Sequence, residues 1–264
     1  MSRKIAHILA ITNQKGGVGK TTTAVNLAAG LAALEKKVLL VDLDPQGNAT
    51  MGSGVEKRDC AQTVYHVLLR QSDCRSVRKP AGKAGYDILP ANRDLAGAEV
   101  ELVSEPERER RLVEAFKGVA YEYDYILIDC PPALNLLTVN ALAAANAVLI
   151  PMQCEYYALE GLSDLVNTVR KVKAGLNPGI EIEGLLRAMF DPRNTLAQQV
   201  SDQLKRHFGD KVYDTVIPRN VRVAEAPSHG LSVLGYDRSS KGAQAYMALA
   251  REIVERRTAN KENQ

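Results

Sequence analysis

The chain has 264 residues, a hydrophobic fraction of 45%, a charged fraction of 25% and a formal net charge of +3 at pH 7. These values are ordinary for a globular domain, and so small a positive charge neither requires nor excludes binding to nucleic acid. Aromatic residues make up only 5% and Trp is absent, which argues against single-stranded nucleic acid held by stacking on aromatic rings.

The four cysteines, Cys60, Cys74, Cys130 and Cys154, form no Cys-x-x-Cys pair and stand at no metal-ligand spacing from a histidine. We therefore expect reduced, buried thiols and not a metal or redox site. The first residues show no secretory signal, and no apolar run is long enough to cross a bilayer. These features predict a cytoplasmic protein.

Short runs rich in β-branched residues and leucine alternate with longer helical patterns along the whole chain. Several of the short runs are almost continuously apolar, which is typical of strands that are covered on both faces. The predicted strands are Ile5–Thr12, Lys37–Asp42, Tyr86–Pro90, Asp124–Asp129, Ala147–Met152, Glu183–Phe190 and Lys211–Ile217.

Apolar residues at helical spacing fill most of the gaps between these strands. The alternation predicts an α/β fold, with one doubly wound, mainly parallel sheet and helices on both faces, over residues 1–257. We expect an exposed loop at Gly52–Asp59 and a frayed polar tail at residues 258–264. The predicted helices are Thr21–Leu34, Glu107–Val119, Leu159–Ala174, Thr195–Phe208 and Ala243–Arg256.

The segment between the first predicted strand and the first predicted helix reads Gln-Lys-Gly-Gly-Val-Gly-Lys-Thr-Thr over residues 14–22. Its glycines allow a tight turn that brings backbone N–H groups against phosphates, and the start of the helix adds more. Lys20 is expected to reach the β- and γ-phosphates, and Thr21 to place its hydroxyl on Mg²⁺. A glycine-rich turn that merely caps a helix would not explain the Lys-Thr pair. The predicted phosphate contacts are Lys15, Gly16, Gly17, Val18, Gly19, Lys20, Thr21 and Thr22.

The loop departs from the ordinary Walker A pattern at its first position, where Gln14 stands in place of glycine and Lys15 follows. The order Lys-Gly-Gly-x-Gly-Lys-Thr is the deviant Walker A signature.

Two carboxylates follow later strands at the edge of the sheet that faces the ligand in this fold class. Asp44 comes just after the second predicted strand and is expected to orient the attacking water or to hold Mg²⁺ through water. Asp129 ends a run of four apolar residues, as in a Walker B strand, and is expected to contact Mg²⁺ directly or through water. Taken singly, each is explained as well by a turn carboxylate, but with the phosphate loop they predict an ATP–Mg²⁺ site.

These segments resemble the nucleotide motifs of the ParA/MinD group of P-loop ATPases. The resemblance is strongest to the ParA/Soj branch, which partitions bacterial chromosomes and plasmids, and Val41–Thr50, Phe190–Gln199 and Val216–Gly230 add to it. It covers nearly the whole chain and implies an ATP hydrolase that closes a sandwich dimer around two ATP molecules. Lys15 of each subunit would then neutralise charge on the partner's phosphates. The implied catalytic residues are Lys15, Lys20 and Asp44, and the implied metal-site residues are Thr21, Asp44 and Asp129.

The resemblance also implies contacts in late segments of the chain. Adenine would lie against them, and double-stranded DNA would be bound without sequence preference through its phosphates. Each arginine taken singly is explained as well by a solvated surface charge, and Met189 by core filling. A ParB-type centromere-binding protein is the implied activator, with the protein associated with the nucleoid. The implied contacts are Met189, Pro218 and Asn220 for adenine, with Arg219 also binding nucleotide, and Arg193, Arg219, Arg222 and, more weakly, Lys241 for DNA.

Three other functions remain to be weighed. A MinD-like membrane ATPase would need an amphipathic C-terminal helix, but Ala243–Arg256 carries a stripe suited to packing on the body, and residues 257–264 include no large apolar side chain. An iron–sulfur carrier would need paired interface cysteines at a spacing that Cys130 and Cys154 lack. A protein that uses ATP only as structural glue would release no phosphate.

Overall fold

One sheet of eight strands forms the centre of the fold, in the order β3-β4-β2-β5-β1-β6-β7-β8. The computed structural model describes residues 5–262, and within them every strand pair is parallel except β3 with β4. The predicted fold class is therefore confirmed. The strands are β1 His7–Ile11, β2 Val38–Asp42, β3 Lys79–Pro80, β4 Asp87–Leu89, β5 Tyr125–Asp129, β6 Ala147–Met152, β7 Glu181–Phe190 and β8 Val212–Pro218.

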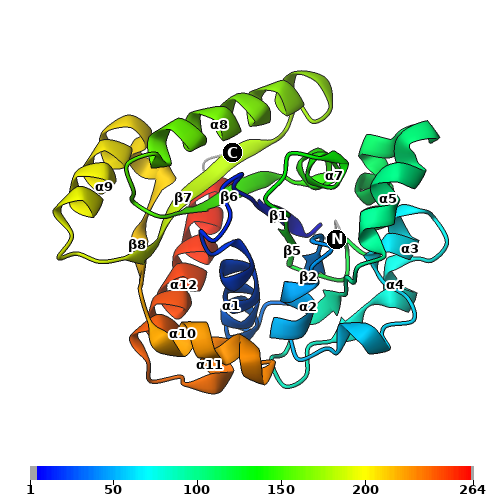
Figure 1. The fold of residues 1–264 in the computed structure, drawn as a ribbon, viewed down its shortest axis with the longest axis horizontal. Coiled ribbons are helices and arrows are strands. Elements are labelled where there is room, and N and C mark those ends of the chain that lie inside the picture. Colours follow the sequence, from blue (N-terminus) through cyan, green and yellow to red (C-terminus); the bar gives the residue numbers. More distant parts are fainter. Residues whose placement is uncertain (1–4, 263–264) are drawn as a thin grey trace.

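Helices connect the strands and cover both faces of the sheet (Figure 1). The α-helices are α1 Lys20–Ala33, α2 Asn48–Gly52, α3 Val64–Leu68, α4 Cys74–Val77, α5 Leu95–Glu101, α6 Arg111–Lys117, α7 Leu136–Ala144, α8 Ala158–Gly175, α9 Thr195–Phe208, α10 Val221–Glu225, α11 Val233–Tyr236 and α12 Lys241–Glu262. The 3₁₀ turns are η1 Lys57–Asp59, η2 Leu102–Ser104, η3 Arg108–Arg110, η4 Gly209–Lys211 and η5 Ala226–His229.

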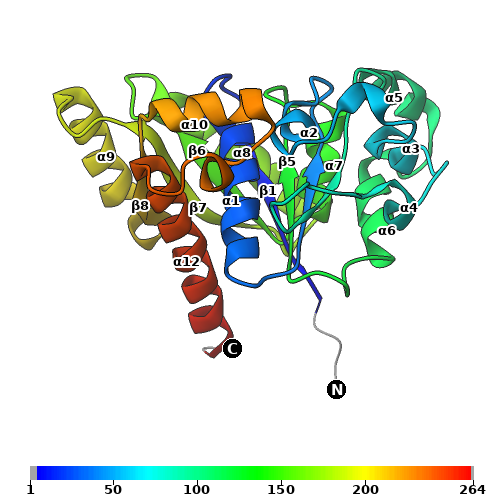
Figure 2. The ribbon, with the colours of Figure 1, turned by 90° about the horizontal axis from the view of Figure 1, so that it is seen from below.

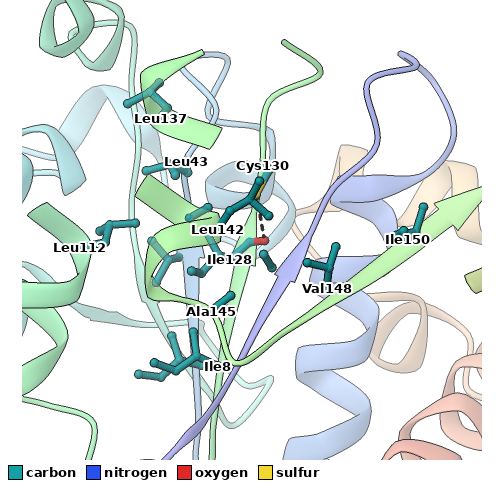
Figure 3. Packing of buried hydrophobic residues seen from close by; sticks show 14 of the residues in the cluster. Ile8, Leu43, Leu112, Ile128, Cys130, Leu137, Leu142, Ala145, Val148 and Ile150 are labelled. Atoms are coloured by element: carbon teal, nitrogen blue, oxygen red, sulfur yellow. Dashed lines mark hydrogen bonds between the residues drawn. The ribbon is translucent and has the colours of Figure 1, made fainter. Parts of the chain in front are cut away.

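Each strand sends successive side chains to opposite faces, and both faces are apolar. Leu9 and Ile11 of β1 pack with α1 and α12 on one face. Ile8 of the same strand belongs to the core on the other face, which α3 to α9 cover. Figure 3 shows part of this second core, which joins Ile8 and Val148 of the sheet with Leu112 of α6 and Leu137 and Leu142 of α7. Burial on both faces explains why the strands read as almost continuous apolar runs.

The parallel register brings functional segments to one end of the sheet. Asp129 at the end of β5 lies opposite Ile11 of β1 on one side and Asp42 of β2 on the other. The predicted phosphate loop follows Ile11 directly, so the loop and the two aspartates meet at the carboxyl edge. In Figure 2, α2, α5 and α10, which follow other strand ends, gather at this same end.

All seven predicted strands are present, and none of their ends differs from the prediction by more than two residues. The two-residue β3 was missed because it is too short to show alternation. Helix α7 was missed because Leu136–Ala144 is apolar on nearly all sides and so has no amphipathic stripe. The predicted helix Glu107–Val119 is broken, because Glu107 has a left-handed φ of 52° and the α-helix begins only at Arg111.

The C-terminal helix is longer than predicted. Helix α12 continues to Glu262, through most of the stretch expected to be a frayed tail, and residues 263–264 lie outside the described residues. Arg256 donates to the carbonyls of Asp210 and Val212, and Arg257 donates to that of Asp124, which fastens this part of the helix to the body. The expected exposed loop at Gly52–Asp59 contains the end of α2 and the turn η1.

All four cysteines are free and buried in the part of the chain that the structure describes, as the sequence predicted. Across residues 5–262, none of the helices has both the length and the apolar character that crossing a bilayer would require.

Gly184 in β7 is expected to tolerate no side chain. A Cβ there would lie 2.5 Å from Cε2 of the buried Tyr213 and 3.0 Å from the carbonyl oxygen of Lys211. Tyr213 cannot easily move, because the Arg256 guanidinium covers its ring at 4.5 Å. We expect Gly184→Ala to lower the free energy of unfolding by about 1–3 kcal/mol, measured by urea denaturation. Gly161→Ala on α8, where an added Cβ meets no atom of residues 5–262 within 4 Å, is the control. Equal midpoints for the two variants would contradict this account of the packing.

Candidate functional site

The loop between β1 and α1 has the backbone shape that its glycines predicted. Gly17 and Gly19 adopt left-handed φ values of 73° and 90°, which cost glycine little and other residues more. A Cβ built on Gly16 or Gly17 would meet no atom of the described chain within 4 Å, so this side of the loop is open. Val18 points inward and is buried. Within residues 5–262 no side chain caps the start of α1, so its first N–H groups are available to an anion.

Lys20 lies inside the loop. Its side chain is buried, and its ammonium donates to the carbonyl oxygen of Lys15 at 2.9 Å. Burial lowers the pKa of Lys20, while the nearby Asp129 and Asp44 act in the opposite direction. A buried cation beside a glycine-rich loop and the start of a helix suits a bound phosphate.

Asp129 is the strongest sign that a cation belongs here. It is fully buried, and neither of its carboxylate oxygens has a partner with hydrogen-bond geometry among residues 5–262, although the Thr21 hydroxyl and the Lys20 ammonium lie near it. Burial raises the pKa of Asp129 well above its usual value and Asp42 adds to this, while Thr21 and Lys20 oppose it. A buried carboxylate without a partner is costly, and a divalent cation would relieve that cost.

The donor set fits Mg²⁺ in a phosphate site better than a cage made of protein ligands alone. Within residues 5–262, no group of three or more His, Cys, Asp or Glu side chains could hold a metal ion. Mg²⁺ in such sites commonly takes one or two carboxylates, a hydroxyl and substrate phosphate oxygens. Thr21 and Asp129 supply a hydroxyl and a carboxylate of this kind.

Asp44 stands beside this cluster on the turn that follows β2. It is half-buried, and its Oδ1 accepts a hydrogen bond from the Gln46 amide at 2.9 Å. Its charge contributes to raising the pKa of both Lys20 and Asp129, so the structure brings these three predicted residues together. Asp42 lies on the same cluster, is fully buried and has a pKa raised by burial. Sequence reasoning gave Asp42 no role, although its place at a strand end was a usable signal.

The exposed Lys15 pairs with a carboxylate from a distant segment of the chain. Its ammonium lies 2.5 Å from Oε2 of Glu155, in the segment after β6. The two side chains are 48% and 49% exposed, so this ion pair is weak and readily exchanged. The neighbouring Gln153 donates to the carbonyl oxygen of Gly17 at 3.1 Å and to Sδ of Met189 at 3.2 Å. Neither Glu155 nor Gln153 carried a local signal in the sequence.

The predicted adenine contacts lie at the ends of β7 and β8. Met189 has a left-handed φ of 50°, unusual for a residue with a side chain, and Gln153 links it to the phosphate loop. Pro218 lies opposite Phe190 in the β7–β8 ladder, and the Asn220 side chain accepts from the Val223 amide to cap α10. Arg219 is exposed between them.

A cavity of about 410 Å³ borders Thr21 and Thr22, between α1, α2 and η5. It does not reach the predicted adenine contacts. Of that set, Met189 lies beside the phosphate loop, where a Cβ built on Gly19 would be 3.8 Å from its methyl carbon.

Three of the predicted DNA contacts follow the same strand ends, and the fourth, Lys241, begins α12. Arg193 binds the Asp191 carboxylate with Nε and Nη2 at 3.0 and 2.8 Å. Arg222 lies 2.9 Å from Glu225 and 3.5 Å from Asp237. Arg219 and Lys241 are exposed. Two of the four basic residues are therefore already paired with carboxylates on the surface.

Comparison with known proteins gives concordant findings. A family model described as an AAA domain matches residues 6–182. The chain is 57% identical over 247 residues to the sporulation initiation inhibitor protein Soj of Bacillus subtilis strain 168. The aligned region covers 94% of this chain and 98% of that protein. It is 52% identical over 254 residues to the chromosome partitioning protein ParA of Myxococcus xanthus strain DK1622, covering 96% of this chain and 90% of that protein.

Solved structures are similar over nearly the full length. One is the cobyrinic acid a,c-diamide synthase from Mycobacterium smegmatis with bound ATP analog and magnesium, with a TM-score of 0.85, 34% identity and 97% of each chain covered. Another is the cell division ATPase MinD of Pyrococcus furiosus, with a TM-score of 0.79 and 26% identity, covering 95% of this chain and 99% of that one.

Removing the buried charge of Asp129 is expected to stabilise the nucleotide-free protein. In the unfolded chain the carboxyl group has a pKa of about 3.9, and burial raises the pKa of Asp129 in the folded protein. The folded protein therefore loses stability as pH rises through the folded pKa, because the buried carboxyl group must then ionise. We expect Asp129→Asn to raise the free energy of unfolding by about 1–3 kcal/mol at pH 7.5 and by less at pH 5, in urea denaturation without nucleotide. The exposed Asp164→Asn on α8 is the control. A loss of stability in Asp129→Asn at pH 7.5 would contradict the assignment of an uncompensated carboxylate.

Proposed function

The chain belongs to the ParA/Soj family of chromosome-partitioning ATPases, and on this basis we propose that it hydrolyses ATP with Mg²⁺ as an ATP-dependent dimer that binds DNA. The observation that carries the proposal is the presence of two lysines with opposite exposure in one phosphate loop. Lys20 is buried beneath the loop, and Lys15 is exposed beside it. The buried Lys20 is suited to a phosphate that its own chain binds, and the exposed Lys15 is suited to a phosphate that a second copy of the chain binds.

Each residue of the site has a distinct task in this proposal. Lys20 and the N–H groups of the loop bind the β- and γ-phosphates. Thr21 and Asp129 hold Mg²⁺, which when bound neutralises charge on the phosphate oxygens. Asp44, on the neighbouring turn, orients the attacking water and accepts hydrogen bonds from it. Catalysis of this kind is mostly positioning and electrostatic stabilisation, which a buried cluster of fixed charges provides.

The surface around the loop supports a second copy of the chain as the partner. Several large apolar side chains are exposed at the same carboxyl edge, each in a segment that follows a strand. Large apolar side chains exposed in these segments would be available to contact such a partner. They are Leu134, Tyr156, Tyr157 and Val221, with exposed fractions of 49%, 74%, 69% and 70%.

In such a dimer Lys15 would exchange Glu155 for the phosphates of the ATP bound by the partner subunit. The exchange is plausible in energy, because an exposed ion pair contributes roughly 0–1 kcal/mol and a triphosphate offers more negative charge. Hydrolysis would then require both subunits, which makes the ATP-bound dimer a timed switch.

DNA binding in the ATP state would use basic residues at the β7 and β8 ends of the same edge. Arg219 and Lys241 are exposed, so DNA phosphates can reach them. Arg193 and Arg222 would first have to leave their carboxylate partners. A dimer doubles the number of such residues, which supports ATP-dependent binding. We further propose that a ParB-type protein stimulates hydrolysis, and that the cycle drives segregation of a chromosome or plasmid at the nucleoid.

The alternatives receive no support from the positions of the relevant residues. The apolar stripe of α12, which a membrane-binding function would need to expose, is buried against the sheet at Tyr246, Leu249 and Ile253. Cys130 and Cys154, which an iron–sulfur function would need at an interface, are buried, and burial raises the pKa of both thiols.

The test is ATP turnover together with oligomeric state, for the native chain, Lys15→Ala and Asp44→Ala. We expect Asp44→Ala to form the ATP-dependent dimer but to lose hydrolysis by at least about 100-fold, and Lys15→Ala to lose both. Phosphate release, and light scattering after size-exclusion chromatography, measure the two properties. Turnover by the native chain is also followed with DNA, with a ParB-type protein and with both, and we expect a synergistic increase. Native turnover by Lys15→Ala in a tight dimer would refute the cross-subunit role.

Charge reversal at Arg219 is expected to remove DNA binding without affecting dimerisation. Arg219→Glu places a carboxylate among DNA phosphates, so retention on non-specific duplex DNA with ATP should fall by at least about tenfold at 100 mM salt. Arg251→Glu on the exposed side of α12 is the matched control and should bind as the native chain does. Equal retention of the two variants would exclude Arg219 from the DNA surface.

A further inference from the structure

A buried pair of side chains holds the turn that carries Asp44. Asp42, the last residue of β2, is fully buried and accepts hydrogen bonds from three groups. Its Oδ2 accepts from the amide and from the hydroxyl of Thr50, both at 2.7 Å, and its Oδ1 accepts from the amide of Asp44 at 3.2 Å. Asp42 therefore ties the first residue of the turn to the middle of α2.

Thr50 extends this connection to the neighbouring strand. It too is fully buried, and its hydroxyl oxygen accepts from the amide of Ala91 at 2.9 Å while its proton goes to Asp42. Ala91 follows β4, the strand beside β2 in the sheet. A single hydroxyl thus joins the end of β2, helix α2 and the segment after β4.

Further contacts close the turn from outside. A Cβ on Gly47 would lie 2.7 Å from the carbonyl oxygen of Ala91, so the two segments are in close contact there. The Lys57 ammonium donates to the carbonyl oxygen of Gln46 at 2.6 Å. Asp44 and Gly47 are joined by a backbone hydrogen bond of 2.8 Å. The backbone on either side of Asp44 has little freedom to move.

We propose that Asp42 and Thr50 are positioning residues for hydrolysis, which hold the backbone of residues 44–50 so that the Asp44 carboxylate faces the phosphate loop. The inference rests on the proposed ATPase function, and neither residue contacts nucleotide in it. A displacement of about 1 Å in a catalytic group can lower a rate by as much as 100-fold. Holding Asp44 therefore affects turnover more than it affects nucleotide binding, which depends on the loop and Lys20.

The side-chain hydroxyl of Thr50 gives the sharpest test, because it can be removed and restored. Thr50→Val keeps the shape but loses both hydroxyl hydrogen bonds, Thr50→Ala loses them without β-branching, and Thr50→Ser keeps them. Thr258→Val removes a hydroxyl that donates to Val254 within α12 and serves as the control.

The first measurement uses nucleotide-free protein and does not depend on activity. We expect amide hydrogen exchange in peptides covering residues 43–51 to be at least tenfold faster in Thr50→Val and Thr50→Ala than in the native chain. Thr50→Ser and Thr258→Val should exchange at the native rate. Native exchange in both Thr50→Val and Thr50→Ala would overturn the proposal.

The second measurement separates kcat from nucleotide affinity. We expect Thr50→Val and Thr50→Ala to lower kcat at least tenfold while ATP affinity stays within about twofold, and Thr50→Ser to restore kcat. A parallel loss of kcat and affinity, or a Thr50→Ser variant as slow as Thr50→Val, would show a merely structural role and overturn the inference. A native chain that releases no phosphate would instead refute the proposed function, and the exchange experiment would still decide whether Thr50 holds the turn.

Discussion

Four charged side chains lie together at one end of an otherwise apolar sheet. The rest of the site depends on how each of these charges is balanced by an opposite charge or a hydrogen bond. Lys20, Asp42 and Asp129 are buried, and Asp44 is half-buried beside them. Asp42 accepts hydrogen bonds within the chain, whereas Asp129 accepts none with hydrogen-bond geometry among residues 5–262 and is offset only by the nearby Thr21 and Lys20. The low-dielectric surroundings that make an uncompensated carboxylate costly also make it a strong ligand for a cation. In the function we propose, a bound cation would relieve the cost of burying the Asp129 carboxylate.

The charges around this buried cluster are of a different kind. Lys15 with Glu155, Arg193 with Asp191, and Arg222 with Glu225 and Asp237 are all partly exposed pairs. Such pairs contribute little to stability and are screened by salt, so their members can change partners at small cost. A fixed centre surrounded by exchangeable ion pairs suits the cycle we propose, in which nucleotide, a second subunit and DNA would bind in turn.

Local chemistry made much of this predictable. The phosphate loop needs particular residues at particular spacings within nine positions, and the strands that flank it are apolar because both faces of the sheet are buried. The residues that sequence reasoning missed act over longer distances. Glu155 meets Lys15 across 140 positions, and Thr50 meets Ala91 across 41. Their residue types are ordinary, and nothing near them in the chain marks the partner.

The sequence by itself determined the fold class, the phosphate loop, and the closeness of Lys20, Asp44 and Asp129 at one end of the sheet, because each depends on a local pattern or on the rule that parallel strands end at one edge. Only the tertiary structure decided which charges are buried without a partner, which are paired on the surface, and what holds Asp44 in place. Those properties follow from strand register and helix packing. Register aligns Asp42 with Asp129, and packing brings α2 against the end of β4, through contacts between segments that are distant in the chain.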